Sequence, residues 1–371
     1  MDRIDLILDL QYGSTGKGLL AGYLAGVSAP DTVITAWAPN AGHTFIDATG
    51  RKFVHTHVAN GIVSPNIRRL LLGPGSLINP GQFLHEVQAC ADIIEERDIR
   101  IAIHPHAALV LGRHVAEEAG PMTKIGSTKK GVGAAMIQRI RRDPDDMNVA
   151  AYSDLLKQYV CTVDEYDALL REARHVMIEG AQGFGLSMYH GFYPYTTSRD
   201  VSTWQVLADC GVPASNVIGK ATLRIYGTAR TFPIRVANRF DTEGTMVGYS
   251  GPVYGDQDEI SFEDIGQATE LTTVTKLPRR IFTFSRKQIA AAIRHCAPEM
   301  VFLNFINYCR TERELSAIVD AIEGTGVRVA FVGTGPAVQN VHNVGSYAYS
   351  TTAERRSEIL NVWRRECSSN R

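Results

Sequence analysis

Apolar and polar stretches alternate along the chain in a way that predicts strands and helices following one another in turn. A continuous apolar run over residues 4–10 predicts a buried strand, and residues 19–27, after a glycine-rich stretch, predict a helix. Residues 32–37 again have the composition of a strand, whereas residues 80–97 and 286–295 have the apolar spacing of helices. Because strands that alternate with helices are typical of α/β proteins, the pattern predicts this fold class.

The last third of the chain has the clearest strand–helix–strand pattern. Residues 301–306 and 327–332 predict two parallel strands, and residues 311–323 predict the helix between them. A capping box of Thr311 and Glu314 opens this helix. Ligands of open α/β sheets bind beyond the carboxyl ends of the strands, so the residues that follow the two strands are candidate contacts for a nucleotide base.

Two stretches are less regular. Residues 236–280 are rich in Gly, Thr and acidic residues, which predicts long active-site loops. Residues 353–367 form an arginine-rich helix whose Glu–Arg pairs indicate a solvated helix, with a partner surface as the alternative. No internal repeat or low-complexity linker divides the chain, so we expect one α/β domain over residues 1–345 and a helical tail over residues 346–371.

Composition narrows the class of protein. The chain has 371 residues, of which 44% are hydrophobic, and this is enough for a full core. A net charge of −1 gives no electrostatic footprint for nucleic acid, and no segment has the pattern of a transmembrane helix or a signal peptide. Six scattered cysteines without a C-x-x-C pair indicate reduced thiols. We therefore expect a cytoplasmic protein with small-molecule ligands and with neither a nucleic-acid nor a membrane partner.

Two His-x-His pairs, His55/His57 and His104/His106, raise the possibility of a metal site. Neither pair has a carboxylate or cysteine at a complementary spacing. We interpret them as ordinary strand histidines.

The segment over residues 9–18 carries the strongest chemical signal. A strand, a glycine-rich turn, Lys17 and the start of a helix form an anion cradle, in which backbone N–H groups face phosphate oxygens and the lysine adds a positive charge. The spacing differs from the Walker A motif, because only two residues separate Gly13 from the pair Gly16–Lys17. A structural turn with a surface lysine is the alternative.

A second segment, Pro39 to Thr44, follows the strand-like run over residues 32–37. His43, beside Gly42, can donate to an oxygen whose negative charge grows during a reaction. Together the two segments resemble the adenylosuccinate synthetase family, which carries a Gly-Asp-Glu-Gly-Lys-Gly loop and an Asn-Ala-Gly-His-Thr loop at this separation. Further matches follow in the same order and extend the resemblance over roughly residues 4–340: Ile125 to Thr128 with Gly131 and Gly133, Arg142, Glu179 to Gly183, Tyr193 to Ser198, and Gly333 to Pro336.

The resemblance implies a fold and a reaction. The fold is a large, mostly parallel central sheet flanked by helices, with long active-site loops. In the family, a nucleoside triphosphate phosphorylates O6 of a purine nucleotide, and the amine of aspartate then displaces that phosphate at C6. The resemblance also implies Mg²⁺ as cofactor, held at Ser14 and Gly42, and a homodimer in which Arg142 reaches the site of the neighbouring subunit.

The site residues carried over by the resemblance fall into four groups. Those in catalytic positions are Ser14, Lys17, His43 and Gln182. Those expected to bind the triphosphate are Gly13, Thr15, Gly16, Lys17, Gly18, Asn307, Gly333, Gly335 and Pro336. Those expected to bind the mononucleotide are Ser14, Asn40, Ser127, Thr128, Arg142, Gln182 and Thr197. Those expected to bind aspartate are Thr273, Val274, Thr275, Arg279 and Arg280. Leu277 replaces the first arginine of the family's aspartate loop, and Lys276 or Arg280 is the candidate replacement cation.

One departure decides the expected substrate. The family has a catalytic aspartate where this chain has Ser14, and that change, followed by Thr15, resembles the phage branch of the family, which acts on deoxyguanylate. We therefore expect a ligase that joins L-aspartate to C6 of dGMP. Asn307 stands where GTP-using members have an aspartate that binds guanine, which favours ATP or dATP as the phosphoryl donor. The alternatives are ordinary adenylosuccinate synthesis from IMP with GTP, a nucleotide-binding regulator without activity, and a simple NTPase or kinase.

Overall fold

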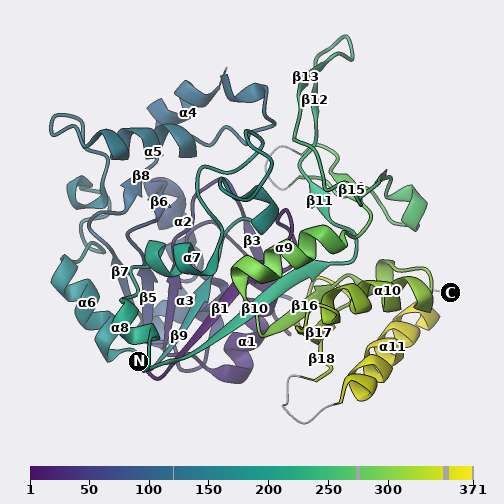
Figure 1. The fold of residues 1–371 in the computed structure, drawn as a ribbon. Coiled ribbons are helices and arrows are strands. Elements are labelled where there is room, and N and C mark those ends of the chain that lie inside the picture. Colours follow the sequence, from purple (N-terminus) through teal and green to yellow (C-terminus); the bar gives the residue numbers. More distant parts are fainter. Residues whose placement is uncertain (120, 273–275, 346–350, 370–371) are drawn as a thin grey trace.

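The computed structural model describes residues 1–119, 121–272, 276–345 and 351–369. Its centre is a nine-stranded sheet with the order β18-β17-β16-β10-β1-β9-β2-β5-β7 (Figure 1). Neighbouring strands are parallel except for β17 and β18, so the predicted α/β class and mostly parallel sheet are confirmed. The strands of this sheet are β1 (Arg3–Asp9), β2 (Thr32–Thr35), β5 (Arg69–Leu72), β7 (Arg100–Ile103), β9 (His175–Glu179), β10 (Thr222–Arg230), β16 (Met300–Asn304), β17 (Arg328–Gly333) and β18 (Val341–Asn343).

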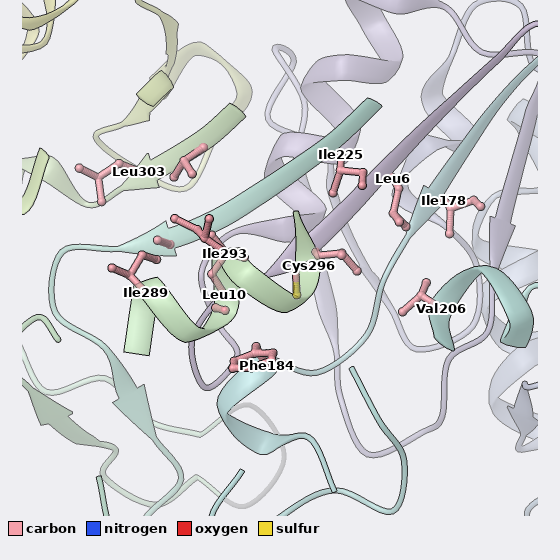
Figure 2. Packing of buried hydrophobic residues seen from close by; sticks show 14 of the residues in the cluster. Leu6, Leu10, Ile178, Phe184, Val206, Ile225, Ile289, Ile293, Cys296 and Leu303 are labelled. Atoms are coloured by element: carbon pink, nitrogen blue, oxygen red, sulfur yellow. The ribbon is translucent and has the colours of Figure 1, made fainter. Parts of the chain in front are cut away.

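The central strand β1 separates two hydrophobic cores. Leu6 and Leu8 point into one core and Ile7 points into the other, because successive side chains of a strand face opposite sides of the sheet. Figure 2 shows the first core, where Ile289 and Ile293 of α9 (Arg286–Cys296) pack over the sheet. Both faces are therefore covered, which explains why the strand sequences are almost continuously apolar.

Helices surround the sheet, and none in the described part of the chain is long and apolar enough to cross a membrane. The other helices are α1 (Lys17–Ser28), α2 (Pro80–Ala89), α3 (Ala91–Glu96), α4 (Gly112–Glu118), α5 (Val132–Arg141), α6 (Val163–Glu172), α7 (Thr203–Asp209), α8 (Ala214–Val217), α10 (Glu312–Glu323) and α11 (Thr352–Ser369). Short strand pairs complete the fold: β3 (His43–Ile46) with β4 (Lys52–His55), and β6 (Leu77–Ile78) with β8 (Ala108–Leu109).

Most of the predicted elements form, and local caps account for their ends. Ser285 caps α9 by accepting a hydrogen bond from the N–H of Gln288 at 2.9 Å. Thr311 caps α10 through the N–H of Glu314 at 3.1 Å. The expected capping box is only half formed, because the Glu314 carboxylate accepts from the N–H of Arg310 instead.

Two predicted boundaries are wrong. The single helix expected over residues 80–97 is divided into α2 and α3, because Cys90 has φ −111° and ψ 12°, outside the helical region. The strand expected over residues 301–306 ends at Asn304, since Phe305 adopts a left-handed conformation and begins a 3₁₀ turn, η6 (Ile306–Tyr308). A reversal of this kind at the carboxyl end of a strand brings the next residues towards a ligand site.

The segment expected to consist of loops has more structure than predicted. Over residues 236–280 the chain forms the hairpin of β12 (Arg239–Phe240) and β13 (Met246–Gly248), which projects from the body in Figure 1, and the short strand β14 (Glu259–Ile260). β14 pairs with β15 (Arg280–Phe282), which also pairs with β11 (Ile234–Arg235).

The arginine-rich helix also departs from its prediction. Only its outer side is solvated, because Ile359, Val362 and Trp363 of α11 are buried in the first core. The division into a domain over residues 1–345 and a tail over residues 346–371 stays a prediction.

Candidate active site

A pocket of about 440 Å³ lies where the central strands β1, β10, β16 and β17 end, as expected for an open α/β sheet. Segments that are far apart in the sequence contribute its wall, so the pocket is a product of the fold and not of any one motif. Among the residues that line it are Gly13, Ser14, Thr15, Gly16, Lys17, Gly18, Asn40, Gly42, His43, Ser127, Thr128, Gln182, Thr197, Arg279, Gly335 and Pro336, all of which the sequence singled out.

The loop between β1 and α1 has the shape of a phosphate cradle. Gly13 and Gly16 have φ angles of 95° and 96°, a left-handed conformation that favours glycine, and α1 begins directly at Lys17. The helix start has no side-chain cap, so its N–H groups are available to phosphate oxygens.

Asp9, to which the sequence analysis gave no role, stabilises this loop by accepting hydrogen bonds from several of its residues. Its fully buried carboxylate accepts from Lys17 Nζ at 2.9 Å and from the Thr15 hydroxyl at 2.5 Å. The backbone N–H of Gln11 donates to its other oxygen at 2.8 Å. Lys17 is therefore held in place by a buried ion pair. An acidic residue at the end of an apolar strand was the available signal.

His43 is paired with the carboxylate of Glu179, which belongs to the family motif over residues 179–183 but was not predicted to have a role of its own. Its Nδ1 lies 2.7 Å from Oε1 of Glu179, and both side chains are buried. The ring also stacks on Trp37 at a centroid distance of 3.8 Å. A carboxylate at Nδ1 fixes the orientation and tautomer of an imidazole and leaves Nε2 for the ligand.

The expected mononucleotide contacts lie on one side of the pocket. Gln182 donates from Nε2 to Oδ1 of Asn40 at 3.1 Å, and Ser127, Thr128 and Thr197 share the wall. The nearby start of α5 is already capped, because the carboxylate of Glu118 accepts from the N–H groups that begin this helix at 2.7 Å. A phosphate here would therefore be met by hydroxyl groups and not by the end of α5.

Arg142 does not line the pocket of its own chain. It caps the C-terminal end of α5 with φ 54° and is exposed to solvent. Its hydrogen bond to the carbonyl of Ile140, at 3.3 Å, is local.

The aspartate end of the pocket is only partly as expected. Thr273, Val274 and Thr275 lie outside the described residues. Arg279 and Leu277 line the pocket, whereas Arg280 and Lys276 do not. Arg280 is instead engaged by Glu259, with contacts of 2.8 and 2.6 Å to the two carboxylate oxygens. The structure therefore offers neither Arg280 nor Lys276 as the replacement for the family's first arginine.

Arg230 and Glu270 form an ion pair at this end that the sequence did not reveal. Arg230 Nη2 lies 2.6 Å from Glu270 Oε1, and Nη1 donates to the carbonyl of Ser14 at 3.4 Å. Burial alone would raise the pKa of Glu270, but Arg230 and then Arg279 outweigh it and lower the pKa below its usual value. Arg230 is paired with Glu270, whereas Arg279 donates from Nε to the carbonyl of Leu271 at 3.3 Å. Two guanidinium groups beside one carboxylate leave a positive charge suited to a carboxylate of a substrate.

The last part of the wall lies at the ends of β16 and β17. Asn304 and Phe305 line the pocket, and Asn304 donates to the carbonyl of Thr15 at 3.3 Å. Asn307, which was expected to bind the triphosphate, lies further on in η6 and does not line the pocket. Its buried Oδ1 has no hydrogen-bond partner among the described residues. Gly333, which was expected to bind the triphosphate, does not line the pocket. It packs directly against Asn304, so closely that a Cβ on Gly333 would collide with the Asn304 side chain.

Comparison with known proteins agrees with this geometry. The sequence model described as adenylosuccinate synthetase matches residues 6–148 and 146–320. The chain belongs to the adenylosuccinate synthetase family. This synthetase is 46% identical over 368 residues to the N6-succino-2-amino-2'-deoxyadenylate synthase of Acinetobacter phage SH-Ab 15497, an alignment that covers 92% of this chain and 93% of the relative.

Solved structures give the same picture. The succinoaminodeoxyadenylate synthetase of cyanophage S-2L, solved with dGMP and with dATP as an energy donor, superposes on this synthetase with a TM-score of 0.88 and 41% identity, covering 99% of both chains. The adenylosuccinate synthetase of Plasmodium falciparum has a TM-score of 0.73 over 91% of this chain and 99% of its own, at 17% identity, and so shows the fold alone.

Proposed function

We propose that this synthetase joins L-aspartate to C6 of dGMP and cleaves ATP or dATP, giving N6-succino-2-amino-2'-deoxyadenylate. Ser14 carries the proposal. It lines the pocket at the place of the family's aspartate, so a short hydroxyl side chain would face the purine where a carboxylate stands in other members. A shorter side chain leaves room for the 2-amino group of guanine. The names of the phage relatives and the dGMP of the cyanophage structure support this choice.

The reaction needs phosphorylation because an amide-like oxygen is a poor leaving group. The loop N–H groups and Lys17 would hold the triphosphate, so that its γ-phosphoryl group passes to O6 of the base. His43, oriented by Glu179, would donate to the O6 or phosphoryl oxygen as charge builds there. The bond to the γ-phosphoryl group breaks, the nucleoside diphosphate leaves, and guanine N1 loses its proton as O6 is phosphorylated. The aspartate amine then forms the new bond to C6 while the C6–O bond breaks, phosphate leaves with its electron pair, and the new C6 nitrogen releases a proton.

Mg²⁺ fits this pocket as the cofactor. Ser14 and Gly42 both line the pocket, and the Ser14 hydroxyl and the Gly42 carbonyl would supply oxygen ligands. Mg²⁺ is a hard ion that prefers oxygen ligands and usually completes its coordination with water and substrate phosphates. When bound, it would neutralise charge on the transferring phosphates.

The donor base is proposed to be adenine. In GTP-using members, a carboxylate accepts two hydrogen bonds from guanine at the position that Asn307 occupies here. A neutral carboxamide both donates and accepts, as adenine requires. The Oδ1 of Asn307 has no partner among the described residues but is buried outside the pocket, so the proposed contact requires this side chain to turn towards the base. Without the charged carboxylate, the affinity for a guanine nucleotide donor should be weaker by about 1.5–3 kcal/mol, or roughly ten- to a hundredfold.

Phosphate release tests both parts of the proposal. With ATP as donor, we expect aspartate-dependent release with dGMP, and little with IMP. GMP is included as a separate arm, because the residues themselves do not favour the deoxyribose. A preference for IMP would favour ordinary adenylosuccinate synthesis, and release that is independent of aspartate would favour a plain NTPase. In the second arm, ATP, dATP and GTP are compared at equal concentration with dGMP, and a preference for GTP would refute the adenine assignment.

A homodimer completes the proposal. Arg142 is exposed, and Ile137 and Ile140 on the same helix are 49% and 67% exposed. A second copy packed on α5 would cover these side chains and could receive Arg142 in its own mononucleotide site. The guanidinium fork suits the 5′-phosphate, because it binds oxygens in pairs.

A further inference from the structure

The C-terminal helix α11 lies outside the part of the chain that the family model matches, which ends at residue 320. It is nevertheless built into the core. Ile359 and Val362 are each 1% exposed, and they pack in the same cluster as residues of α10 and β17. Figure 1 shows α11 beside α10, at the end of the sheet that carries β16 to β18. The helix is therefore placed behind the donor end of the pocket.

Trp363 connects α11 to the turn that follows β16. Its buried indole N–H donates to the carbonyl of Cys309 at 3.0 Å. Cys309 closes η6, because its own N–H donates to the carbonyl of Ile306 at 3.2 Å. In the same turn, the N–H of Tyr308 donates to the carbonyl of Phe305 at 3.0 Å. The hydrogen bond of Trp363 thus reaches the turn that begins with Phe305 and carries Asn307.

This turn needs support, because Phe305 is an aromatic residue in the left-handed region, with φ 59° and ψ 39°. Such a conformation is unfavourable and persists only where the surroundings fix it from several sides. Asn304 Oδ1 accepts from the N–H of Phe305 at 2.9 Å, and Thr231 donates to its carbonyl at 2.7 Å. The far end of the turn is held by Trp363.

We propose that Trp363 is a positioning residue for the donor nucleotide, and that α11 is the element through which it acts. The inference rests on the proposed function, in which the donor base binds beside Phe305 and Asn307. Trp363 touches no substrate. It fixes the turn on which the base-binding side chains stand, so that the turn is already ordered when the nucleotide arrives.

The variant Trp363→Phe tests this role, because it keeps an aromatic ring in the core and removes the N–H donor. Loss of one buried hydrogen bond corresponds to about a fivefold change in an equilibrium constant. We expect the KM for ATP and dATP to rise about three- to tenfold, with the KM for dGMP and aspartate and the kcat at saturation within twofold of the parent. Arg365→Gln is the matched control, since it removes an exposed charge from the same turn of α11 and should leave all constants unchanged.

The variant Asn307→Ala separates this inference from the proposed function. If Asn307→Ala raises the KM for ATP and Trp363→Phe does not, the role of Trp363 is refuted and the base site stands. If neither variant changes that constant, the proposed base site is itself wrong. If Trp363→Phe raises the KM of all three substrates alike, Trp363 is merely structural and the inference is overturned.

Hydrogen–deuterium exchange of the parent protein gives a second measurement that does not depend on a variant folding. Coupling between α11 and the donor site must be reciprocal, so a nucleotide that binds the turn should protect the helix. We expect ADP to slow exchange in α11 around Trp363, and dGMP alone to have no such effect. Unchanged exchange with saturating ADP would overturn the inference.

Discussion

Ser14 stands in the middle of the phosphate loop with φ 56°, and its side chain lines the pocket. We predict that Ser14→Asp weakens the use of dGMP, because a longer side chain would crowd the 2-amino group. Overpacking of this kind costs about 1–3 kcal/mol, or roughly five- to a hundredfold in kcat/KM. Steady-state rates with dGMP and IMP measure it, and Ser14→Ala serves as the control for loss of the hydroxyl alone. A Ser14→Asp variant that used dGMP as fast as the parent would contradict the proposed role.

Glu179 does not line the pocket, so we expect this carboxylate to affect the reaction through His43. Glu179→Gln keeps the size of the side chain but removes the negative charge that faces Nδ1 at 2.7 Å. We expect kcat to fall about 10–100-fold, as is common for a partner that orients a functional histidine, with little change in the KM for ATP. Glu86→Gln is the comparison for general damage to the fold, because Glu86 is a buried carboxylate outside the pocket that accepts from the N–H groups of His57 and Val58. A kcat within twofold of the parent would show that the carboxylate is dispensable.

At the scale of elements, the edge strand β7 is followed by a histidine that makes the free energy of unfolding depend on pH. Burial, with the positive charges of His106 and Arg139, lowers the pKa of His104, just after β7, to about 4. Between pH 6.5 and 4 the unfolded chain therefore takes up a proton that the folded chain refuses, and the free energy of unfolding falls as the pH falls. The limit for one such group is about 1.4 kcal/mol per pH unit.

The variant His104→Asn tests this linkage. Nδ1 of His104 accepts from the N–H of His106 at 3.1 Å, and an asparagine oxygen can accept the same bond without titrating. We expect urea midpoints of the variant to depend less on pH between 6.5 and 4.5 than those of the parent. Parallel curves for the two proteins would show that His104 does not contribute.

How far the sequence could predict the elements depends on the range of the contacts that define them. The strand β1 was predicted from its continuous apolar run. The helices α9 and α10 were predicted because their apolar spacing and an N-cap residue both lie within a short stretch of sequence. The break at Cys90 was missed, since nothing in the apolar spacing of residues 80–97 marks it.

The same limit applies to the candidate site. The loop at Lys17 and the segment at His43 were visible as motifs. The pairs Arg230–Glu270 and Trp363–Cys309 were not, because each joins residues at least 40 positions apart that only the tertiary fold brings together.

At the scale of the whole molecule, we expect a site that is complete only in a dimer. Arg142→Ala and Lys17→Ala should each be inactive, because each removes a phosphate contact from every site. Mixing the two should restore about a quarter of the parental activity, since half of the dimers are hybrids and one of their two sites has both groups. Each variant incubated with itself is the control. No recovery, with hybrid dimers demonstrated by mass, would count against Arg142 acting in trans.

The close packing around Asn304 has a consequence for the order in which its neighbours can change during evolution. A Cβ on Gly16 would lie 2.5 Å from Asn304 Nδ2, and one on Gly333 would overlap Oδ1 of the same side chain. In the GTP-using members of the family a serine precedes the Thr-Gly-Pro segment, at the place of Gly333, and its Cβ is incompatible with the present position of the Asn304 side chain. A Cβ on Gly333 would also lie 2.7 Å from Cζ of Phe302, so a change at Asn304 relieves only part of the crowding. We predict that Gly333→Ser lowers the melting temperature on its own and lowers it less together with Asn304→Thr; equal losses in both backgrounds would refute this. A lineage in which asparagine arises at position 304 must then lose the serine at the place of Gly333 first, and can return only by the reverse order of steps.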